Sequence, residues 1–198
     1  MTIQKLPLGM FQANCYVVSE GAQALLVDPG DRPEEVLNYL ALNGLKLELI
    51  LLTHGHVDHV NGVDGIMKAH RVPVYLHPAD KLAIDEHTRI FGTMETESIP
   101  VYDQMVIPFA GHEIRVIETP GHTKGGVSYY VDGNLFAGDT LFHHSIGRSD
   151  LPGGDFDELV DSISAKLYKL PDETIVYSGH ESDTDIGHEK KYNNFVKG

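Results

Sequence analysis

Residues 49–52 are four consecutive aliphatic side chains, and the sequence His-Gly-His-Val-Asp-His follows almost at once, at residues 54–59. An unbroken apolar run of this kind predicts a strand that is buried on both faces. A loop rich in potential metal ligands begins where that strand ends. The chain is therefore expected to place three imidazoles and one carboxylate at the end of a buried strand.

The spacing of these four side chains predicts how they divide. In extended backbone, residues i and i+2 point to the same side, so His54 and His56 can close on one ion. Asp58 and His59 are adjacent and diverge, which places them better for a second ion. Imidazole nitrogen and carboxylate oxygen are ligands of zinc, and such mixed sets also suit iron and manganese. Twelve histidines allow some clustering by chance, but four potential ligands in six residues at a strand end favour a metal site.

Three further potential ligands each follow an apolar, strand-like run and a small residue. His122 lies in Pro-Gly-His-Thr, Asp139 in Gly-Asp-Thr and His180 in Gly-His. Glycine allows the sharp bend that exposes the next side chain. Strand ends that gather at one edge of a sheet would bring these side chains together.

The pattern of apolar residues along the chain indicates a mixed α/β protein with many strands. Helices are expected over 60–69, 78–86 and 157–169, and another is expected to begin at Asp31, with Pro33 in its first turn. The early alternation of strand and helix fits a doubly wound sheet equally well. Strands are expected near residues 2–7, 13–19, 23–28, 48–53, 73–77, 104–108, 113–118, 126–131, 134–137 and 174–177.

Composition narrows the classes of partner and location. The 198 residues carry a net charge of −14, a field that repels phosphate backbones and argues against a nucleic-acid partner. No apolar run approaches the roughly 20 residues of a membrane span. The N-terminal residues lack the layout of a signal peptide, so a cytoplasmic location is expected. Cys15 is the single cysteine and is interpreted as a small buried hydrophobe. Nothing in the sequence indicates an oligomeric state.

Taken in order, the motifs His-x-His-x-Asp-His, Pro-Gly-His-Thr, Gly-Asp-Thr and Gly-His resemble the metallo-β-lactamase superfamily. The resemblance runs from Val27-Asp28-Pro29-Gly30 to His180. Within the superfamily the chain is most similar to glyoxalase II-like (hydroxyacylglutathione hydrolase-like) enzymes, including short bacterial forms. The segments Gly138–Phe142 and Gly147–Asp150 carry that narrower similarity.

The resemblance implies a fold and a metal centre. The fold would be a four-layer αββα sandwich, with residues 1–198 forming one domain that lacks the C-terminal helical extension of full-length glyoxalase II. The centre would hold two divalent ions, zinc or alternatively iron or manganese. Asp28 would accept a hydrogen bond from a ligand or its loop, although a plain turn aspartate is the equal alternative. The implied ligands are His54, His56 and His122 for the first ion, Asp58, His59 and His180 for the second, and Asp139 as the bridge.

The resemblance also implies a reaction, which is attack of a metal-bound hydroxide on a small thioester such as an S-2-hydroxyacylglutathione. Asp58 and Asp139 would be the catalytic carboxylates. Arg148 stands where a glutathione-binding basic residue is expected, and Asp150 stands where a tyrosine is expected. Their alternative is a simple ion pair in a turn. Ser182 also replaces a tyrosine, which puts glutathione specificity in question.

Other functions remain open at this point. Persulfide dioxygenases share the motif set and use one iron held by two histidines and one aspartate. Another small ester or a lactone could be the substrate, and a metal-stabilised domain without catalysis is a third possibility. His143 and His144 lie beside the motif that contains Asp139, and we interpret them as loop or pocket-lining residues.

Overall fold

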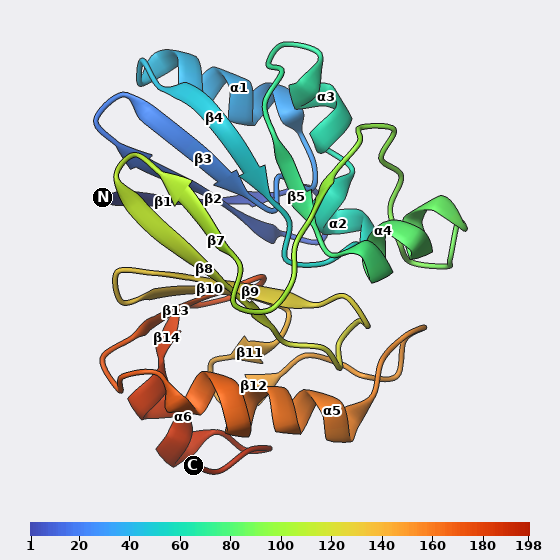
Figure 1. Ribbon diagram of the computed structural model, residues 1–198, viewed down its shortest axis with the longest axis vertical. Helices are drawn as coiled ribbons and strands as arrows, with labels where there is room; N and C mark the ends of the chain where they lie inside the picture. Colours follow the sequence, from blue (N-terminus) through green and yellow to red (C-terminus); the bar gives the residue numbers. More distant parts are fainter.

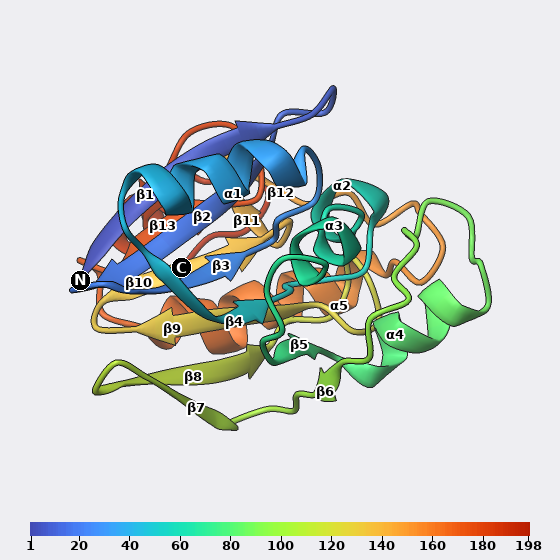
Figure 2. The same ribbon diagram turned by 90° about the horizontal axis from the view of Figure 1, so that it is seen from above.

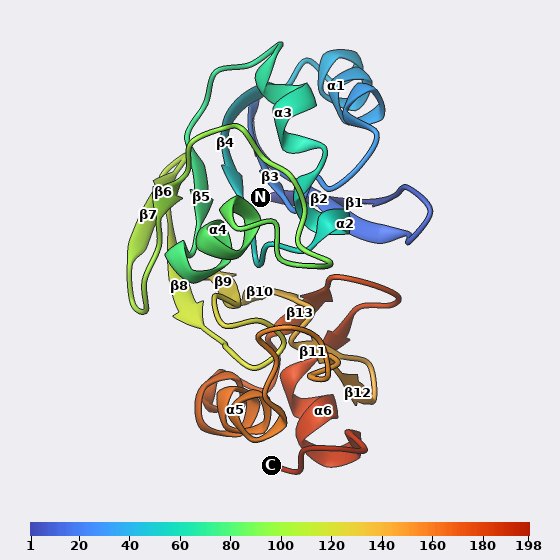
Figure 3. The same cartoon turned by 90° about the vertical axis from the view of Figure 1, so that its right-hand side faces the viewer.

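A computed structural model describes all of residues 1–198 and contains two six-stranded sheets packed face to face, with helices on both outer sides (Figure 1). Viewed from the side, α1 and α3 lie beyond one sheet, and α5 and α6 lie beyond the other (Figure 3). The layers therefore follow the order helix, sheet, sheet, helix, which confirms the αββα sandwich expected from the motifs.

The first sheet has the strand order β1-β2-β3-β4-β5-β6. Strands β1 to β3 form an antiparallel meander, and β3 to β6 pair in parallel. From above, α1 and α3 lie over this sheet (Figure 2). Its elements and those around it are β1 (Thr2–Leu8), β2 (Ala13–Glu20), β3 (Gln23–Val27), α1 (Pro33–Leu42), β4 (Lys46–Leu51), α2 (Val57–Val60), α3 (Val63–Met67), β5 (Val74–Leu76), α4 (Pro78–Asp85) and β6 (Ile99–Pro100).

The second sheet has the order β14-β13-β10-β9-β8-β7, and β11 and β12 form a separate small hairpin. Strands β10 and β13 are parallel, and the other pairs of this sheet are antiparallel. The elements are β7 (Val106–Phe109), β8 (His112–Glu118), β9 (Val127–Val131), β10 (Asn134–Gly138), β11 (Leu141–Phe142), β12 (Ser145–Ile146), α5 (Phe156–Asp161), β13 (Ile175–Ser178), β14 (Thr184–Asp185) and α6 (Ile186–Tyr192).

Strand β4 shows why an unbroken apolar run was required. Leu49 and Leu51 point into the core between the two sheets, whereas Ile50 and Leu52 pack in the core beneath α1 and α3. All four side chains are buried, and burial stabilises each by about 1.5–3 kcal/mol relative to exposure. A third core fills the space between the second sheet and α5 and α6, where Leu135 and Val176 meet Leu159.

Two helices begin or continue differently from the expectation. Arg32, in a left-handed conformation with φ of 44°, occupies the N-cap position of α1, and the Asp31 carboxylate accepts a hydrogen bond from the Arg32 N–H instead of capping the helix. The helix expected over 60–69 is two short helices, and at Gly62 between them a Cβ would lie 2.3 Å from the Pro29 carbonyl oxygen. Helix α2 begins within the ligand motif itself, directly after His56.

The long helix expected over 157–169 changes its geometry along its length. Asp155 caps α5 by accepting a hydrogen bond from the Glu158 N–H at 3.0 Å. A π-helical turn at Ser162–Lys166 and a 3-10 turn at Leu167–Lys169 follow. Helix α6 and the short strands β6, β11, β12 and β14 were not predicted. No helix is both long enough and apolar enough to span a bilayer.

Candidate metal centre

The predicted ligands come from the ends of four strands that point the same way within the sandwich. Loop 54–59 follows β4 of the first sheet, whereas His122, Asp139 and His180 follow β8, β10 and β13 of the second. Strand β10 is parallel to β13 and, through β9, has the same direction as β8. The carboxyl ends of all three therefore meet at one edge, where the loop from β4 joins them.

Two groups of potential ligands at this edge correspond to the expected division, and a third, made of Asp28, His54 and His59, overlaps them. The ligand atoms of His54, His56 and His122 lie within 4.8 Å of one another, and so do those of Asp58, His59 and His180. Within the first group, His122 Nε2 lies 3.0 Å from His56 Nδ1. Within the second, His180 Nε2 lies 3.3 Å from Asp58 Oδ2. These two groups contain the same residues as the two sets that the resemblance implies.

The Asp139 carboxylate lies between the two groups. Its Oδ2 is 3.6 Å from His122 Nε2 on one side and 3.6 Å from His180 Nε2 on the other, and its Oδ1 is 3.5 Å from His59 Nε2. A single carboxylate that faces ligands of both groups has the position required of a bridge between two ions.

The donor atoms fit a pair of divalent metal ions. Nε2 of His54, His56 and His59 and Oδ1 of Asp139 are buried without a hydrogen-bond partner. Buried polar atoms are rarely left unpaired, because each costs roughly 1–3 kcal/mol. Here the four unpaired atoms share one site and belong to residue types that bind zinc, iron and manganese.

Burial and charge set the protonation of these ligands. Burial, together with neighbouring imidazoles, lowers the pKa of His54 well below its usual value and that of His56 to about 3, so both rings are neutral and offer lone pairs. Burial also acts on His59, but Asp139 and Asp28 outweigh it and raise its pKa to about 9. For Asp58, burial is outweighed by hydrogen bonding to His180 and by His59, and its pKa falls to about 2.

Asp28 lies behind the second group of ligands. Its Oδ1 accepts a hydrogen bond from the Thr53 N–H at 2.7 Å, and its Oδ2 accepts one from Thr53 Oγ1 at 2.6 Å. The same Oδ2 lies 3.0 Å from His59 Nδ1. A hydrogen bond from Nδ1 to this carboxylate would hold the His59 ring with Nε2 facing Asp139. Asp28 adopts a left-handed conformation, with φ of 50°, to reach both partners.

Asp80, at the start of α4, is a buried carboxylate that the sequence did not single out. Its Oδ2 accepts hydrogen bonds from the Gly55 N–H and Thr123 Oγ1, each at 2.8 Å, and its Oδ1 accepts one from the Gly125 N–H at 2.8 Å. Burial raises the pKa of Asp80, and the three donors partly offset that effect. Asp80 thus joins the loop that carries His56 to the loop that carries His122.

Replacing Asp80 with alanine should destabilise the protein by about 2–4 kcal/mol, because two backbone N–H groups and one hydroxyl lose their acceptor inside the protein. Metal affinity should fall with stability, since both ligand loops lose their common support. Urea unfolding and zinc titration measure the two effects. Asp85→Ala on the same helix is the control, because Asp85 is an exposed partner of Lys81 and should cost little. Equal stability of the two variants would contradict the role given to Asp80.

Gly179 is required where the His180 loop passes the bridging carboxylate. A Cβ at this position would lie 2.1 Å from Asp139 Oδ1 and 3.0 Å from His59 Cε1. The small residue before each ligand was expected to provide a sharp bend. Gly179 provides room as well, because any side chain would push against the carboxylate between the two groups.

Arg148 and Asp150 form an ion pair with each other. Arg148 Nε and Nη2 each donate to one oxygen of Asp150 at 2.8 Å, and the two side chains are 60% and 69% exposed. The backbone of the same segment contacts the metal centre, because the Arg148 carbonyl lies 2.7 Å from His122 Nδ1. His143 and His144 lie in the turn between β11 and β12, outside both groups of ligands.

Comparison with known families gives one match that spans most of the chain. The model of the metallo-beta-lactamase superfamily matches residues 8–180. The chain is 35% identical to the probable metallo-hydrolase YqgX of Bacillus subtilis, with 100% of this chain and 99% of that protein covered. It is 32% identical to the hydroxyacylglutathione hydrolase GloC of Haemophilus influenzae, with 99% and 98% covered.

Solved structures are also similar to this chain over nearly its whole length. The BLEG-1 B3 metallo-beta-lactamase is 36% identical with a TM-score of 0.89, and each chain is covered in full. TTHA1623 in a di-iron-bound form is 37% identical with a TM-score of 0.86, with 98% of this chain and 100% of that chain covered. ETHE1 from Myxococcus xanthus is 27% identical with a TM-score of 0.85, with 99% and 84% covered.

Proposed function

The chain belongs to the metallo-β-lactamase superfamily, and from that premise we propose that it is a dinuclear metal-dependent hydrolase of small thioesters such as S-2-hydroxyacylglutathione. The coarser statement, a metallo-hydrolase, agrees with the relative YqgX. The proposed substrate is a small molecule in the cytoplasm. The similarity to the hydroxyacylglutathione hydrolase GloC supports this choice of substrate class.

The position of Asp139 is the observation that carries the proposal. Its carboxylate faces His122 of one group of ligands and His59 and His180 of the other. Seven side chains would thus hold two ions, with His54, His56 and His122 on the first, Asp58, His59 and His180 on the second, and Asp139 on both. The similarity to TTHA1623 in its di-iron-bound form supports a two-metal centre and leaves iron beside zinc and manganese as the metal.

When bound, two such ions supply Lewis acidity and lower the pKa of a shared water toward neutrality. The protein contributes orientation and access. Asp58 is ionised at neutral pH, since its pKa lies near 2, and its carboxylate can accept a hydrogen bond from the attacking water and direct it at the thioester carbonyl. His180 and Asp58 are 24% and 18% exposed, whereas His54 is only 2% exposed. Substrate therefore approaches from the side of Asp58 and His180.

Room for a substrate also lies beside the first group of ligands. A groove of about 190 Å³ is lined in part by Phe91 and Lys124. The Phe91 ring packs against the His56 ring at 5.0 Å between centroids, and Lys124 follows two residues after His122. The lining also includes the carboxylates of Asp80 and Glu86, so the groove offers a mixed apolar and charged surface beside the first group of ligands.

The test measures metal content and hydrolysis of S-lactoylglutathione on the same preparation. We expect two ions per chain, thioester cleavage that is lost on chelation and cleavage that returns when zinc or iron is restored. A β-lactam should be assayed in parallel because of the similarity to BLEG-1. Full metal occupancy with no cleavage of any thioester would overturn the substrate class, and cleavage that survives complete metal removal would overturn the mechanism.

Arg148→Ala is expected to raise the KM for S-lactoylglutathione about three- to tenfold and to leave kcat within about twofold. The exposed pair with Asp150 contributes little, so Arg148 can exchange this partner for a substrate carboxylate without a large penalty. Initial rates measured over a range of substrate concentrations separate the two parameters. Arg71→Ala is the matched control at another exposed arginine. An unchanged KM would assign Arg148 and Asp150 to the turn alone.

A mononuclear iron persulfide dioxygenase is the second candidate. The similarity to ETHE1 gives it some support. That reaction consumes oxygen, so an oxygen electrode with glutathione persulfide as substrate distinguishes it directly. One iron per chain together with oxygen uptake and no thioester cleavage would favour this candidate over the hydrolase.

A further inference from the structure

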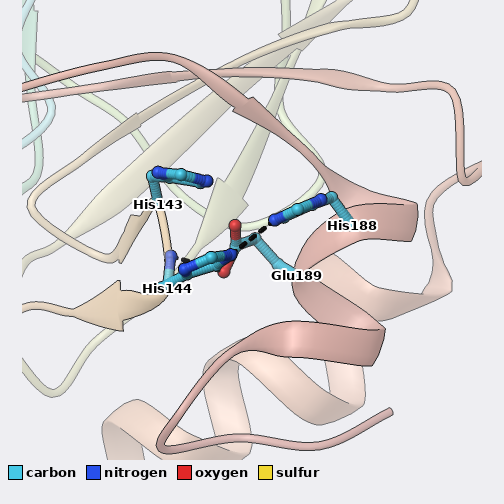
Figure 4. A group of neighbouring side chains, drawn as sticks. All are labelled: His143, His144, His188 and Glu189. Atoms are coloured by element: carbon cyan, nitrogen blue, oxygen red, sulfur yellow. Dashed lines mark hydrogen bonds between the residues drawn. The ribbon is translucent and has the colours of Figure 1, made fainter.

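Three imidazoles outside the metal centre converge between the β11–β12 hairpin and α6. His143 and His144 form the turn of the hairpin, and His188 lies in the first turn of α6 (Figure 4). One potential ligand atom from each, together with a carboxylate oxygen of Glu189, lies within 4.8 Å of the others. Ring centroids are 4.0 Å apart for His143 and His144, and 5.2 Å apart for His143 and His188.

The closest contact in the cluster joins two ring nitrogens head to head. His144 Nε2 lies 2.6 Å from His188 Nε2, and the two rings are inclined by only 9°. Facing nitrogens of this kind either share a proton or offer both lone pairs to one cation. Zinc–imidazole bonds of about 2.0–2.1 Å in a tetrahedral site place neighbouring nitrogens roughly 3.3 Å apart. The rings of His144 and His188, both partly exposed, would turn away from this head-to-head contact so that both lone pairs point at one ion.

The Glu189 carboxylate lies beside the three imidazoles and binds the backbone of the hairpin turn. Glu189 is fully buried and forms no ion pair with lysine or arginine. Its Oε2 accepts hydrogen bonds from the His144 N–H at 3.0 Å and from Asn193 Nδ2 at 2.8 Å, and its Oε1 accepts one from Thr184 Oγ1 at 2.6 Å. The Glu189 carboxylate therefore lies beside the three imidazoles, where it would balance part of the charge of a bound cation.

The turn that carries two of the imidazoles is fixed by α6 and the residues that follow it. Asn194 Nδ2 donates to the His144 carbonyl at 2.9 Å, and Asn193 Nδ2 donates to the Ser145 carbonyl at 3.0 Å. His144 itself has a φ of 59°, a left-handed conformation that costs free energy and persists only when its surroundings hold it. The ring of His144 is thus oriented toward His188 before any ligand arrives.

We propose that His143, His144 and His188 form an additional site for one divalent transition-metal ion, with zinc as the preferred occupant. Three imidazoles leave a fourth position for water, and Glu189 supplies the compensating charge. A set of nitrogen donors selects zinc, nickel or copper over magnesium and calcium. The site is separate from the seven ligands that follow the strand ends, so it depends neither on the proposed reaction nor on Asp139.

Occupancy of this site would affect the mouth of the main centre. Phe142, the residue before the turn, has its ring 6.4 Å from that of His180. A metal ion would join the hairpin that carries Phe142 to α6 and so restrict one wall of the entrance. Once the seven-ligand centre is filled, additional zinc should therefore change the KM of the enzyme more than its kcat.

The experiment counts zinc on the metal-loaded protein after equilibrium dialysis at fixed free zinc concentrations. Wild-type protein should bind one zinc ion per chain more than His188→Gln, and His70→Gln should match the wild type. His143→Ala, at an exposed position, is a second variant that tests the same site without touching α6. NMR of the imidazole nitrogens adds a direct readout, because the ring signals of His144 and His188 should shift as the additional ion binds.

Equal zinc counts in the wild type and in both cluster variants would overturn the proposal. So would a loss of the same size in His70→Gln, which would show binding to surface histidines in general. If the seven-ligand centre proved not to hold two ions, the difference between wild type and His188→Gln would still measure this site. Failure of the proposed function and failure of the additional site are therefore distinguishable.

Discussion

Asp139→Asn should lower kcat for thioester hydrolysis on the order of a thousandfold and reduce metal content at the same time. The carboxylate offers one oxygen to His59 and the other to the space between His122 and His180. An asparagine of the same shape replaces one of these oxygens with an NH₂ group, which has no lone pair for a metal. Each orientation of the amide therefore removes a ligand from one ion or weakens the bridge.

The measurement combines steady-state kinetics, metal analysis and thermal unfolding of the same samples. The metal-free proteins should melt at similar temperatures, because the substitution conserves the volume of the side chain. Asp157→Asn, at an exposed position on α5, controls for the change of charge. If Asp139→Asn kept two ions and lost less than about tenfold in kcat, Asp139 would not be the bridge between two ions.

Gly30→Ala should destabilise the protein by more than about 3 kcal/mol and abolish tight metal binding. A Cβ at Gly30 would lie 1.6 Å from the Asp58 carbonyl oxygen and 2.6 Å from the His59 nitrogen. These atoms are backbone, so the whole ligand loop would have to move away. Two ligands of the second ion belong to that loop, and stability and metal binding should therefore fail together.

Gly44→Ala provides the comparison that isolates the cause. Gly44 has open space around its Cα and a φ of 63°, so its replacement costs only the strain of a left-handed residue, about 1–2 kcal/mol. Chemical denaturation with and without zinc measures both variants. If Gly30→Ala were as stable as Gly44→Ala and bound zinc normally, the close contact between the 28–30 turn and the ligand loop could not be essential.

The gathering of these histidines and aspartates at one edge could be predicted from the sequence because strong local signals mark them. A buried strand, a small residue and a histidine or aspartate recur at His122, Asp139 and His180, and such strand ends meet wherever the strands share a direction. The ten longer strands were predicted for the same reason, since each carries its own apolar pattern. The order of the layers followed only from the resemblance to a known superfamily, because alternation alone also fits a doubly wound sheet.

Other features depend on contacts between segments far apart in the chain. Asp80 lies 25 residues from Gly55 and 43 from Thr123, and nothing local marks it as their common acceptor. Helix α6 carries two lysines and few apolar side chains, so it shows no helical period, and tertiary contacts such as those of Ile186 hold it in place. The pairing of His144 with His188 spans 44 residues and is visible only once the hairpin and α6 are both in position.

The proposed metal centre would take its ligands from both sheets of the sandwich. His54, His56, Asp58 and His59 extend from the first sheet, and His122, Asp139 and His180 extend from the second. Neither set alone can complete the coordination of an ion, so metal binding and the docking of the two halves form one thermodynamic cycle. Slow amide hydrogen exchange along β4 and β10 should therefore depend on free metal concentration, and in metal-poor conditions the two sheets should open as separate cooperative units.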